Sequence, residues 1–296
     1  MRDWLESPWV HWPVMAALAL IASAAGRRAF HAWQLAEAAA DGEAVPLMAA
    51  AAPTPSAPSA VRLRVLFIGN SLSAPLPALL HAMGDRAGMP IVAEGETPGG
   101  RTLAEHAATP HILQRIQQSS WDVVVLQEQS ELPSFSEATR MRDMYPAGLS
   151  LAHAVSVAGA RAWLYGMYAH EHGDRDNLPA DTYRDMQSRL DKGIEVLAGL
   201  TQLRVVPAGA AFSEALDWEP PPQLWADGRH ASASGNLLVC SVFFATLLGI
   251  DPTGVPFDAG VPSELARRLR ALAARTVASR LGLTLAQPSH GAVRSM

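Results

Sequence analysis

The chain has 296 residues, a formal net charge of -5 and 49% hydrophobic residues, which suits one sizeable globular domain with additional segments. This charge, without any basic run, gives no electrostatic basis for binding nucleic acid, so we expect no nucleic-acid partner. The single cysteine, Cys240, excludes an intrachain disulfide and a metal site built from cysteines alone, and it leaves the redox compartment open.

The N-terminal region is hydrophobic and differs in composition from the rest of the chain. Residues 13–25 are uncharged and largely apolar, and Arg27 and Arg28 follow after Gly26. A signal peptide is one interpretation, although acidic residues spoil its usual basic start. A membrane anchor with residues 9–25 in contact with lipid is another, although that stretch is slightly short. We expect residues 1–48 to be a leader or anchor of a membrane-anchored or exported protein; a cytoplasmic location stays open.

Residues 49–60 are rich in proline, alanine and serine, which predicts an extended linker before a folded domain at residues 61–296. In that domain, strand and helix patterns alternate. The strand candidates are Leu63–Ile68, Ile91–Ala93, Asp122–Leu126, Ala162–Tyr165 and Arg204–Val206. The helix candidates are Leu76–Ala87, Leu103–Gln117, Glu137–Ala158, Asp181–Leu197, Ser234–Leu248 and Ser263–Leu281. The continuous apolar run 123–126 is typical of a strand buried on both faces, so we expect a three-layer α/β/α domain with a mostly parallel five-stranded sheet.

A serine follows the first strand candidate at the point where its apolar run stops. The segment reads Gly69-Asn70-Ser71, and open α/β sheets bind their ligands at the carboxyl ends of such strands. A serine hydroxyl becomes a strong nucleophile only when a base takes its proton. Ser71 is therefore a candidate nucleophile; the structural alternative is a cap for the following helix.

An aspartate and a histidine lie three residues apart near the end of the domain. Asp227 and His230 precede a long apolar helix candidate in a loop rich in Asp, Gly and Arg. Histidine is the usual general base near neutral pH, and an aspartate on its other ring nitrogen fixes the tautomer. The pair can activate Ser71; the structural alternative is an ordinary turn that caps a helix.

Two further segments can supply hydrogen-bond donors to a developing oxyanion. Gly99 and Gly100 follow the second strand, where glycine lets a backbone N–H approach a ligand closely. Gln127 and Gln129 follow the third strand on one side of it, with Glu128 on the other. Solvated loop tips are the alternative in both places.

Two other features lie near the predicted site. The segment His170-Glu171-His172-Gly173-Asp174 follows the fourth strand at the same sheet edge. We interpret it as a lid, a substrate-contact loop or a plain solvated loop, and we expect no metal there because a further ligand is not evident. Trp225 lies two residues before Asp227 and belongs either to the substrate cleft or to the core.

With these segments in this order, residues 63–250 resemble an SGNH (GDSL-type) hydrolase. The resemblance implies a flavodoxin-like fold, with Ser71 as nucleophile, His230 as base and Asp227 as its orienting acid. It also implies that the backbone N–H groups of Ser71 and Gly100 donate to the oxyanion.

The third block departs from the family pattern. Its asparagine, a further oxyanion donor, is replaced by Gln129, and its glycine by Gln127. A glutamine carries the same amide donor on a stem longer by one methylene. We therefore expect a variant with Gln129 as the third donor, and Gln127 is the alternative.

The resemblance implies hydrolysis of an acyl ester through an acyl-enzyme on Ser71, with no metal or cofactor. We expect a small-molecule or carbohydrate ester with a short acyl group, such as acetyl. Two alternatives stay open. The same residues could transfer the acyl group to a sugar hydroxyl, or the domain could be a catalytically idle binding module tethered to a membrane. The sequence leaves the oligomeric state open.

Overall fold

A computed structural model describes residues 62–118 and 120–288. The expected leader at 1–48 and linker at 49–60 lie outside these residues, so both stay predictions, and so does the location of the protein. Among the described residues, no helix combines the length and the apolar character that a membrane crossing requires.

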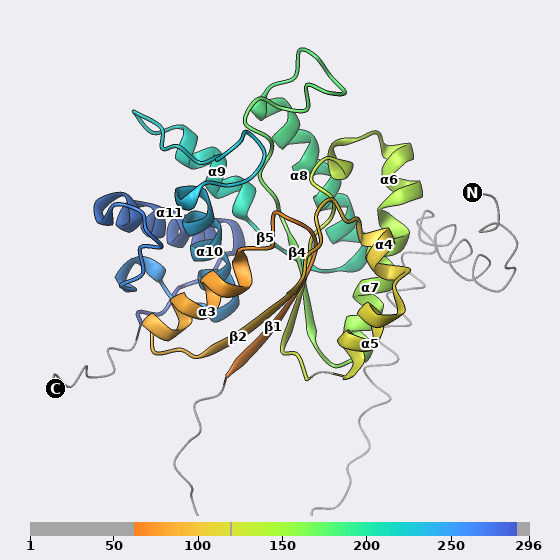
Figure 1. The fold of residues 1–296 in the computed structure, drawn as a ribbon, viewed down its shortest axis with the longest axis horizontal. Coiled ribbons are helices and arrows are strands. Elements are labelled where there is room, and N and C mark those ends of the chain that lie inside the picture. Colours follow the sequence, from red (N-terminus) through yellow and green to blue (C-terminus); the bar gives the residue numbers. More distant parts are fainter. Residues whose placement is uncertain (1–61, 119, 289–296) are drawn as a thin grey trace, which may run out of the picture. The chain divides into compact units, whose positions relative to one another are not determined.

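Five parallel strands form the centre of the described domain, in the spatial order β2-β1-β3-β4-β5 (Figure 1). The strand order reverses between β1 and β3, and open α/β sheets bind ligands at such a switch point. The predicted three-layer α/β/α fold with a five-stranded sheet is confirmed. The strands are β1 (Leu63–Ile68), β2 (Ile91–Glu96), β3 (Val123–Leu126), β4 (Arg161–Tyr165) and β5 (Arg204–Val206).

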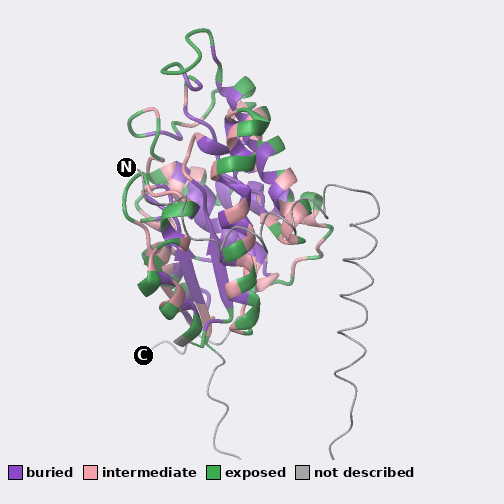
Figure 2. Cartoon of the chain, turned by 90° about the vertical axis from the view of Figure 1, so that its right-hand side faces the viewer, coloured by how far each residue is buried: buried purple, intermediate pink, exposed green. Residues whose placement is uncertain are grey.

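Helices cover both faces of the sheet because its central strands are apolar on both faces. All four residues of β3 are buried, and the side chains of β1 divide between two separate hydrophobic clusters. Figure 2 shows the buried strands enclosed between helices. One face packs against α3 (Leu76–Arg86), α9 (Ala208–Leu216), α10 (Ala233–Leu248) and α11 (Ser263–Leu281). The other packs against α4 (Leu103–Ala107), α5 (Pro110–Gln118) and α7 (Tyr145–Val157). Helix α8 (Tyr183–Thr201) contributes to both clusters, and α6 (Glu137–Asp143) precedes α7.

Helix α10 is apolar around most of its circumference because it is enclosed by the sheet, α3 and α11. The Phe243 ring lies edge-on to Phe67 of β1 and Tyr165 of β4, with centroid distances of 5.3 and 5.0 Å. Cys240 is fully buried in the same helix, and burial raises the pKa of its thiol. This packing fixes the start of α10, and with it the loop that carries Asp227 and His230.

Two predicted helices are interrupted in the structure, and one helix was missed. The expected helices 103–117 and 137–158 are each divided into two, at Pro110 and next to Pro146. A proline has no N–H to donate and its ring crowds the preceding turn, so it begins a helix more readily than it continues one. Helix α9 was not predicted, although Ala208, Ala211 and Phe212 have helical spacing and are fully buried.

Candidate active site

The three strands that carry the predicted site end level with one another. Ile68, the last residue of β1, pairs with Glu96 on β2 and with Leu126 on β3. Backbone bonds extend this register by one step, since Gly69 N donates to Glu96 O at 3.0 Å and Gln127 N donates to Ile68 O at 2.8 Å. The segments after β1, β2 and β3 therefore start at the same edge of the sheet.

Ser71, His230 and Asp227 form a continuous chain of hydrogen bonds at this edge. The His230 Nε2 atom lies 3.0 Å from Ser71 Oγ, although the two residues are 159 positions apart. On the other side of the ring, Nδ1 lies 2.8 Å from Asp227 Oδ2. A carboxylate only accepts hydrogen bonds, so it holds the proton on Nδ1 and leaves Nε2 free to accept from the serine hydroxyl. A base is thus oriented toward a hydroxyl.

The Asp227 carboxylate is held by its own turn. Its Oδ1 accepts the backbone N–H of His230 at 2.7 Å and that of Arg229 at 2.9 Å. The backbone N–H of His230, the His230 ring and the N–H of Arg229 together hold the pKa of this carboxyl well below its usual range. Asp227 is therefore ionised across the neutral range and can stabilise a positively charged imidazolium.

Neither of the alternative capping roles is found. Helix α3 begins after Pro75, and the Ser71 side chain caps no helix. Helix α10 is capped instead by Ser232, whose hydroxyl accepts the N–H of Gly235 at 3.2 Å. The side chains of Ser71, Asp227 and His230 are engaged with one another rather than with helix ends.

The loop that carries His230 is anchored to the core. The Ala231 N–H donates to the Tyr168 hydroxyl at 3.0 Å, and the Trp225 indole N–H donates to Ala169 O at 3.1 Å. Trp225 is only 4% exposed and its ring lies edge-on to Phe212. Of the two interpretations of Trp225, the structure therefore supports core packing.

Gly100 and Ser71 both present unused backbone donors. Gly100 has a φ of +69°, and Arg101 N donates to Pro98 O at 3.3 Å across the turn. A turn with a positive φ at this position favours glycine. Within the described residues, no hydrogen bond uses the N–H of Ser71 or of Gly100, so both are free to bind a ligand oxygen.

The two glutamines have different surroundings. Gln129 Oε1 accepts the backbone N–H groups of Glu131 and Leu132, at 2.8 and 2.9 Å, and no bond within the described region uses its amide nitrogen. Gln127 is fully buried, and its amide nitrogen donates to Asn70 Oδ1 at 2.8 Å and to the backbone oxygen of the next residue at 2.6 Å. The Gln129 amide is thus held through its oxygen while its nitrogen has no partner in the described structure, whereas both amide hydrogens of Gln127 are used.

Gln127 instead holds the serine turn in place. Its Oε1 accepts the Asn70 N–H at 3.0 Å and the Ser73 hydroxyl at 2.7 Å. A Cβ at Gly69 would lie 2.5 Å from this oxygen, so only glycine fits before Asn70. The conformation of Gly69-Asn70-Ser71 therefore depends on a side chain from β3.

Sequence reasoning missed two side chains that support the turn. The Asn70 side-chain amide donates to Arg101 O at 3.1 Å, which joins the serine turn to the glycine segment. His106 of α4 lies with Nε2 2.7 Å from Gly69 O, so this nitrogen carries the proton, and burial lowers the pKa of the ring. Nothing in the local sequence pattern around His106 indicates this contact.

The segment 170–174 is attached to the His230 loop. Glu171 N donates to Gly228 O at 2.8 Å. His170 is buried, and its Nε2 atom lies 4.0 Å from Glu131 Oε1 without a hydrogen-bond partner in the described structure, whereas His172 is exposed. In residues 62–118 and 120–288, no three His, Cys, Asp or Glu side chains are grouped so as to hold a metal ion. The segment therefore lies next to the loop that carries His230, and its role as a lid, a substrate-contact loop or a solvated loop stays a prediction.

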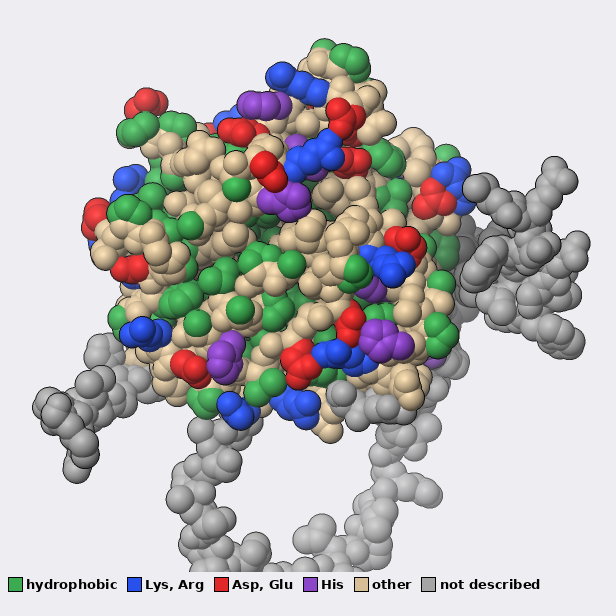
Figure 3. Space-filling model, viewed as in Figure 1, with side chains coloured by type: hydrophobic (Ala, Val, Ile, Leu, Met, Phe, Trp, Pro, Cys, Tyr) green, Lys and Arg blue, Asp and Glu red, His purple; other side chains and the backbone are tan. Residues whose placement is uncertain are grey.

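The surface around this edge is polar. Figure 3 shows histidine, acidic and basic side chains close together on the upper part of the face that it displays. Arg229, next to His230, forms ion pairs with Glu131, at 3.4 Å, and with Asp176. These pairs join the His230 loop to the segments that follow β3 and β4.

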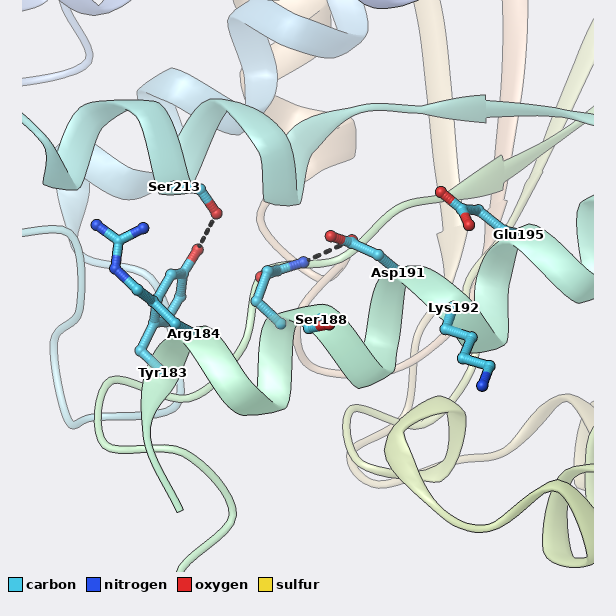
Figure 4. A pocket seen from close by; sticks show the side chains of 8 residues that line it. Tyr183, Arg184, Ser188, Asp191, Lys192, Glu195 and Ser213 are labelled. Carbon is cyan, nitrogen blue, oxygen red and sulfur yellow. Dashed lines mark hydrogen bonds between the residues drawn. The ribbon is translucent and has the colours of Figure 1, made fainter.

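A separate hollow of about 510 Å³ lies between α8 and α9 (Figure 4). In it, the hydroxyl groups of Tyr183 and Ser213 lie 2.9 Å apart, and Gln187 Nε2 donates to Asp191 Oδ1 at 2.8 Å. The hollow contains none of the predicted site residues, so it is distinct from the candidate site.

The fold agrees with those of known structures. A DUF4886 family protein from Bacteroides uniformis matches with a TM-score of 0.65 and 16% identity, over 73% of this chain and 95% of that one. A protein from Slackia heliotrinireducens, provisionally described as an SGNH hydrolase, matches with a TM-score of 0.53 and 26% identity, over 63% of this chain and 100% of that one. No family model matches the sequence, and neither does any curated protein. The chain has the fold of the SGNH hydrolase superfamily.

Proposed function

We propose that this protein is a serine ester hydrolase in which Ser71 forms an acyl-enzyme. The observation that carries the proposal is the hydrogen-bonded series Ser71–His230–Asp227 at the sheet edge where the segments with the three unpaired donors also start. His230 Nε2 takes the hydroxyl proton while Ser71 Oγ attacks the ester carbonyl. Asp227 holds the ring in the required tautomer and stabilises the imidazolium that forms.

The negative charge that develops on the carbonyl oxygen needs donors that are already in place. The backbone N–H groups of Ser71 and Gly100 and the side-chain amide of Gln129 fill this role. None of the three has a hydrogen-bond partner within the described residues, so none has to be released before it binds the oxyanion. Loss of one such donor typically lowers kcat by about 10²–10³-fold.

The second half of the reaction repeats the first with water. After the alcohol has left with a proton from His230, the ring takes a proton from water as the water oxygen attacks the acyl-enzyme. His230 then gives this proton to Ser71 Oγ as the bond between Ser71 and the acyl group breaks and the acid is released. No step needs an oxidant, a reductant or a metal, since the proton that moves at each stage is held on His230 Nε2.

We propose that the substrate is a short acyl ester, such as acetyl, on a bulky alcohol such as a carbohydrate. The basis is the exposure of the site: the side chains of His230 and Asp227 are 47% and 56% exposed. An open nucleophile can approach an ester on a large carrier without a deep cavity, whereas a long acyl chain would need apolar cover.

The test is hydrolysis of p-nitrophenyl acetate, butyrate and octanoate by the full chain, with Ser71→Ala as the control. We expect turnover that is fastest for acetate and is abolished by the substitution. Equal turnover by Ser71→Ala would contradict the nucleophile, and a preference for octanoate would contradict the short acyl group. With an acetylated oligosaccharide as donor and a second one as acceptor, acetylated acceptor in place of free acetate would favour acyl transfer over hydrolysis.

A further inference from the structure

Glu128 is a buried carboxyl between the two glutamines at the end of β3. It is only 1% exposed, and burial raises the pKa of its side chain to about 7. The charged groups that act on it are Glu105 of α4 and Asp143 of α6, both of them acidic. No cation pairs with it among the described residues, so burial and like charges disfavour its ionised form.

One oxygen of this carboxyl joins two segments of the candidate site. Glu128 Oε1 accepts the backbone N–H of Gln129 at 2.7 Å and that of Leu103 at 3.0 Å. Leu103 begins α4, and only its N-cap residue Thr102 separates it from the turn that contains Gly100. The same acceptor therefore holds the segments of two proposed oxyanion donors.

The backbone of Glu128 is tied to the third segment. Its carbonyl oxygen accepts Gln127 Nε2 at 2.6 Å and lies 3.4 Å from Asn70 Nδ2, which comes from the serine turn. All three segments that supply proposed donors thus meet at one residue. A misplacement of about 1 Å in a reacting group can cost on the order of 10²-fold in rate, so their relative position matters.

The other oxygen of the Glu128 carboxyl lowers the stability of the fold, so stability alone does not explain why a glutamate occupies this position. Glu128 Oε2 is buried and has no hydrogen-bond partner in the described structure. An unpaired buried polar group lowers the stability of the folded state. Such groups, and carboxyls with shifted pKa values, are concentrated at functional sites.

We propose that Glu128 is a positioning residue of the oxyanion site: its Oε1 atom fixes Gln129 and the Gly100 turn relative to Ser71. The inference rests on the proposed function. Glu128 does not touch the substrate; it acts through the two backbone N–H groups that it accepts. This role requires an acceptor oxygen where Glu128 Oε1 lies, and it does not require a negative charge.

Three substitutions of Glu128 in the full chain test the proposal. Glu128→Gln keeps the acceptor oxygen and should keep kcat for p-nitrophenyl acetate within about 3-fold. Glu128→Ala removes the acceptor, and Glu128→Asp draws it back by one methylene; each should lower kcat by roughly 10–100-fold with KM changed less than about 3-fold. Affinity for a boronic acid that forms a tetrahedral adduct on Ser71 should fall by the same factor as kcat. Glu128→Asp supplies the result if Glu128→Ala does not fold.

The matched control is Leu269→Ala on α11, which removes fully buried contacts without touching the site segments. We expect it to lower stability and leave kcat unchanged. Unchanged kcat in both Glu128→Ala and Glu128→Asp would overturn the proposal, and so would a Glu128→Gln variant as slow as Glu128→Ala. Full turnover by Ser71→Ala would instead overturn the proposed function itself, so the two failures are distinguishable.

Discussion

The substitution Glu128→Gln should change how the stability of the protein depends on pH. The ordinary pKa of the carboxyl is 4.5, and burial raises it to about 7 in the folded chain. Between these values the folded chain keeps the proton while the unfolded chain loses it. The free energy of unfolding contributed by Glu128 is therefore fully present below pH 4.5 and is lost as pH rises through 7. The difference of about 2.5 pKa units corresponds to about 3 kcal/mol.

Urea unfolding of the wild type and Glu128→Gln at intervals from pH 4 to 8 measures this contribution. His106 and His170 have pKa values lowered by burial, so they contribute stability that is lost as pH falls, with the opposite slope. Both histidines are present in both proteins, so their effect cancels in the difference. We expect the wild type to lose about 3 kcal/mol relative to the variant between pH 4 and 8. A difference that stays flat, or that rises with pH, would refute the reasoning about the buried carboxyl.

Substitution of Gln129 should affect catalysis, whereas substitution of Gln127 should affect stability. In steady-state kinetics, Gln129→Ala should lower kcat by about 10²–10³-fold with little change in KM. In urea unfolding, Gln127→Ala should lower the free energy of unfolding by about 1–3 kcal/mol for each buried group left unpaired. The reverse pattern would contradict the assignment of the two roles. Asp227→Asn should lower kcat, by less than the roughly 10⁴-fold of a buried triad because solvent screens this exposed carboxylate; unchanged kcat would exclude its role. A Cβ at Gly193 would lie 2.2 Å from a backbone oxygen, so Gly193→Ala should lower the free energy of unfolding by about 1–3 kcal/mol. A Cβ at Gly199 in the same helix would contact nothing, so Gly199→Ala should raise it by about 0.5–1 kcal/mol. Equal effects in urea unfolding would contradict the close packing of α8 at Gly193.

Local pattern was sufficient for much of the fold. The strand Leu63–Ile68 and the helix Ser263–Leu281 have the predicted bounds. In both segments, the spacing of the apolar residues and the intrinsic strand or helix propensity of the residues favour the same element. The long helix predictions were wrong at Pro110 and Pro146, since an apolar period continues across a proline although the hydrogen bonds do not.

The site was predictable as far as it depends on strand ends. Ser71 and Gln129 follow parallel strands, and such strands end at a common edge, so their proximity follows from the topology. The role of Gln127 could not be predicted, because its amide is paired with Asn70, 57 positions away. The burial of Glu128 depends likewise on α4, whose position no local pattern specifies.

The central claim is that His230 activates Ser71 as a nucleophile. The most direct measurement is the intact mass of the full chain after treatment with a fluorophosphonate, followed by mapping of the modified residue. We expect one adduct, on Ser71, that forms at a greatly reduced rate in His230→Ala and not at all in Ser71→Ala. Absence of an adduct in the wild type, or an adduct on another residue, would contradict the account.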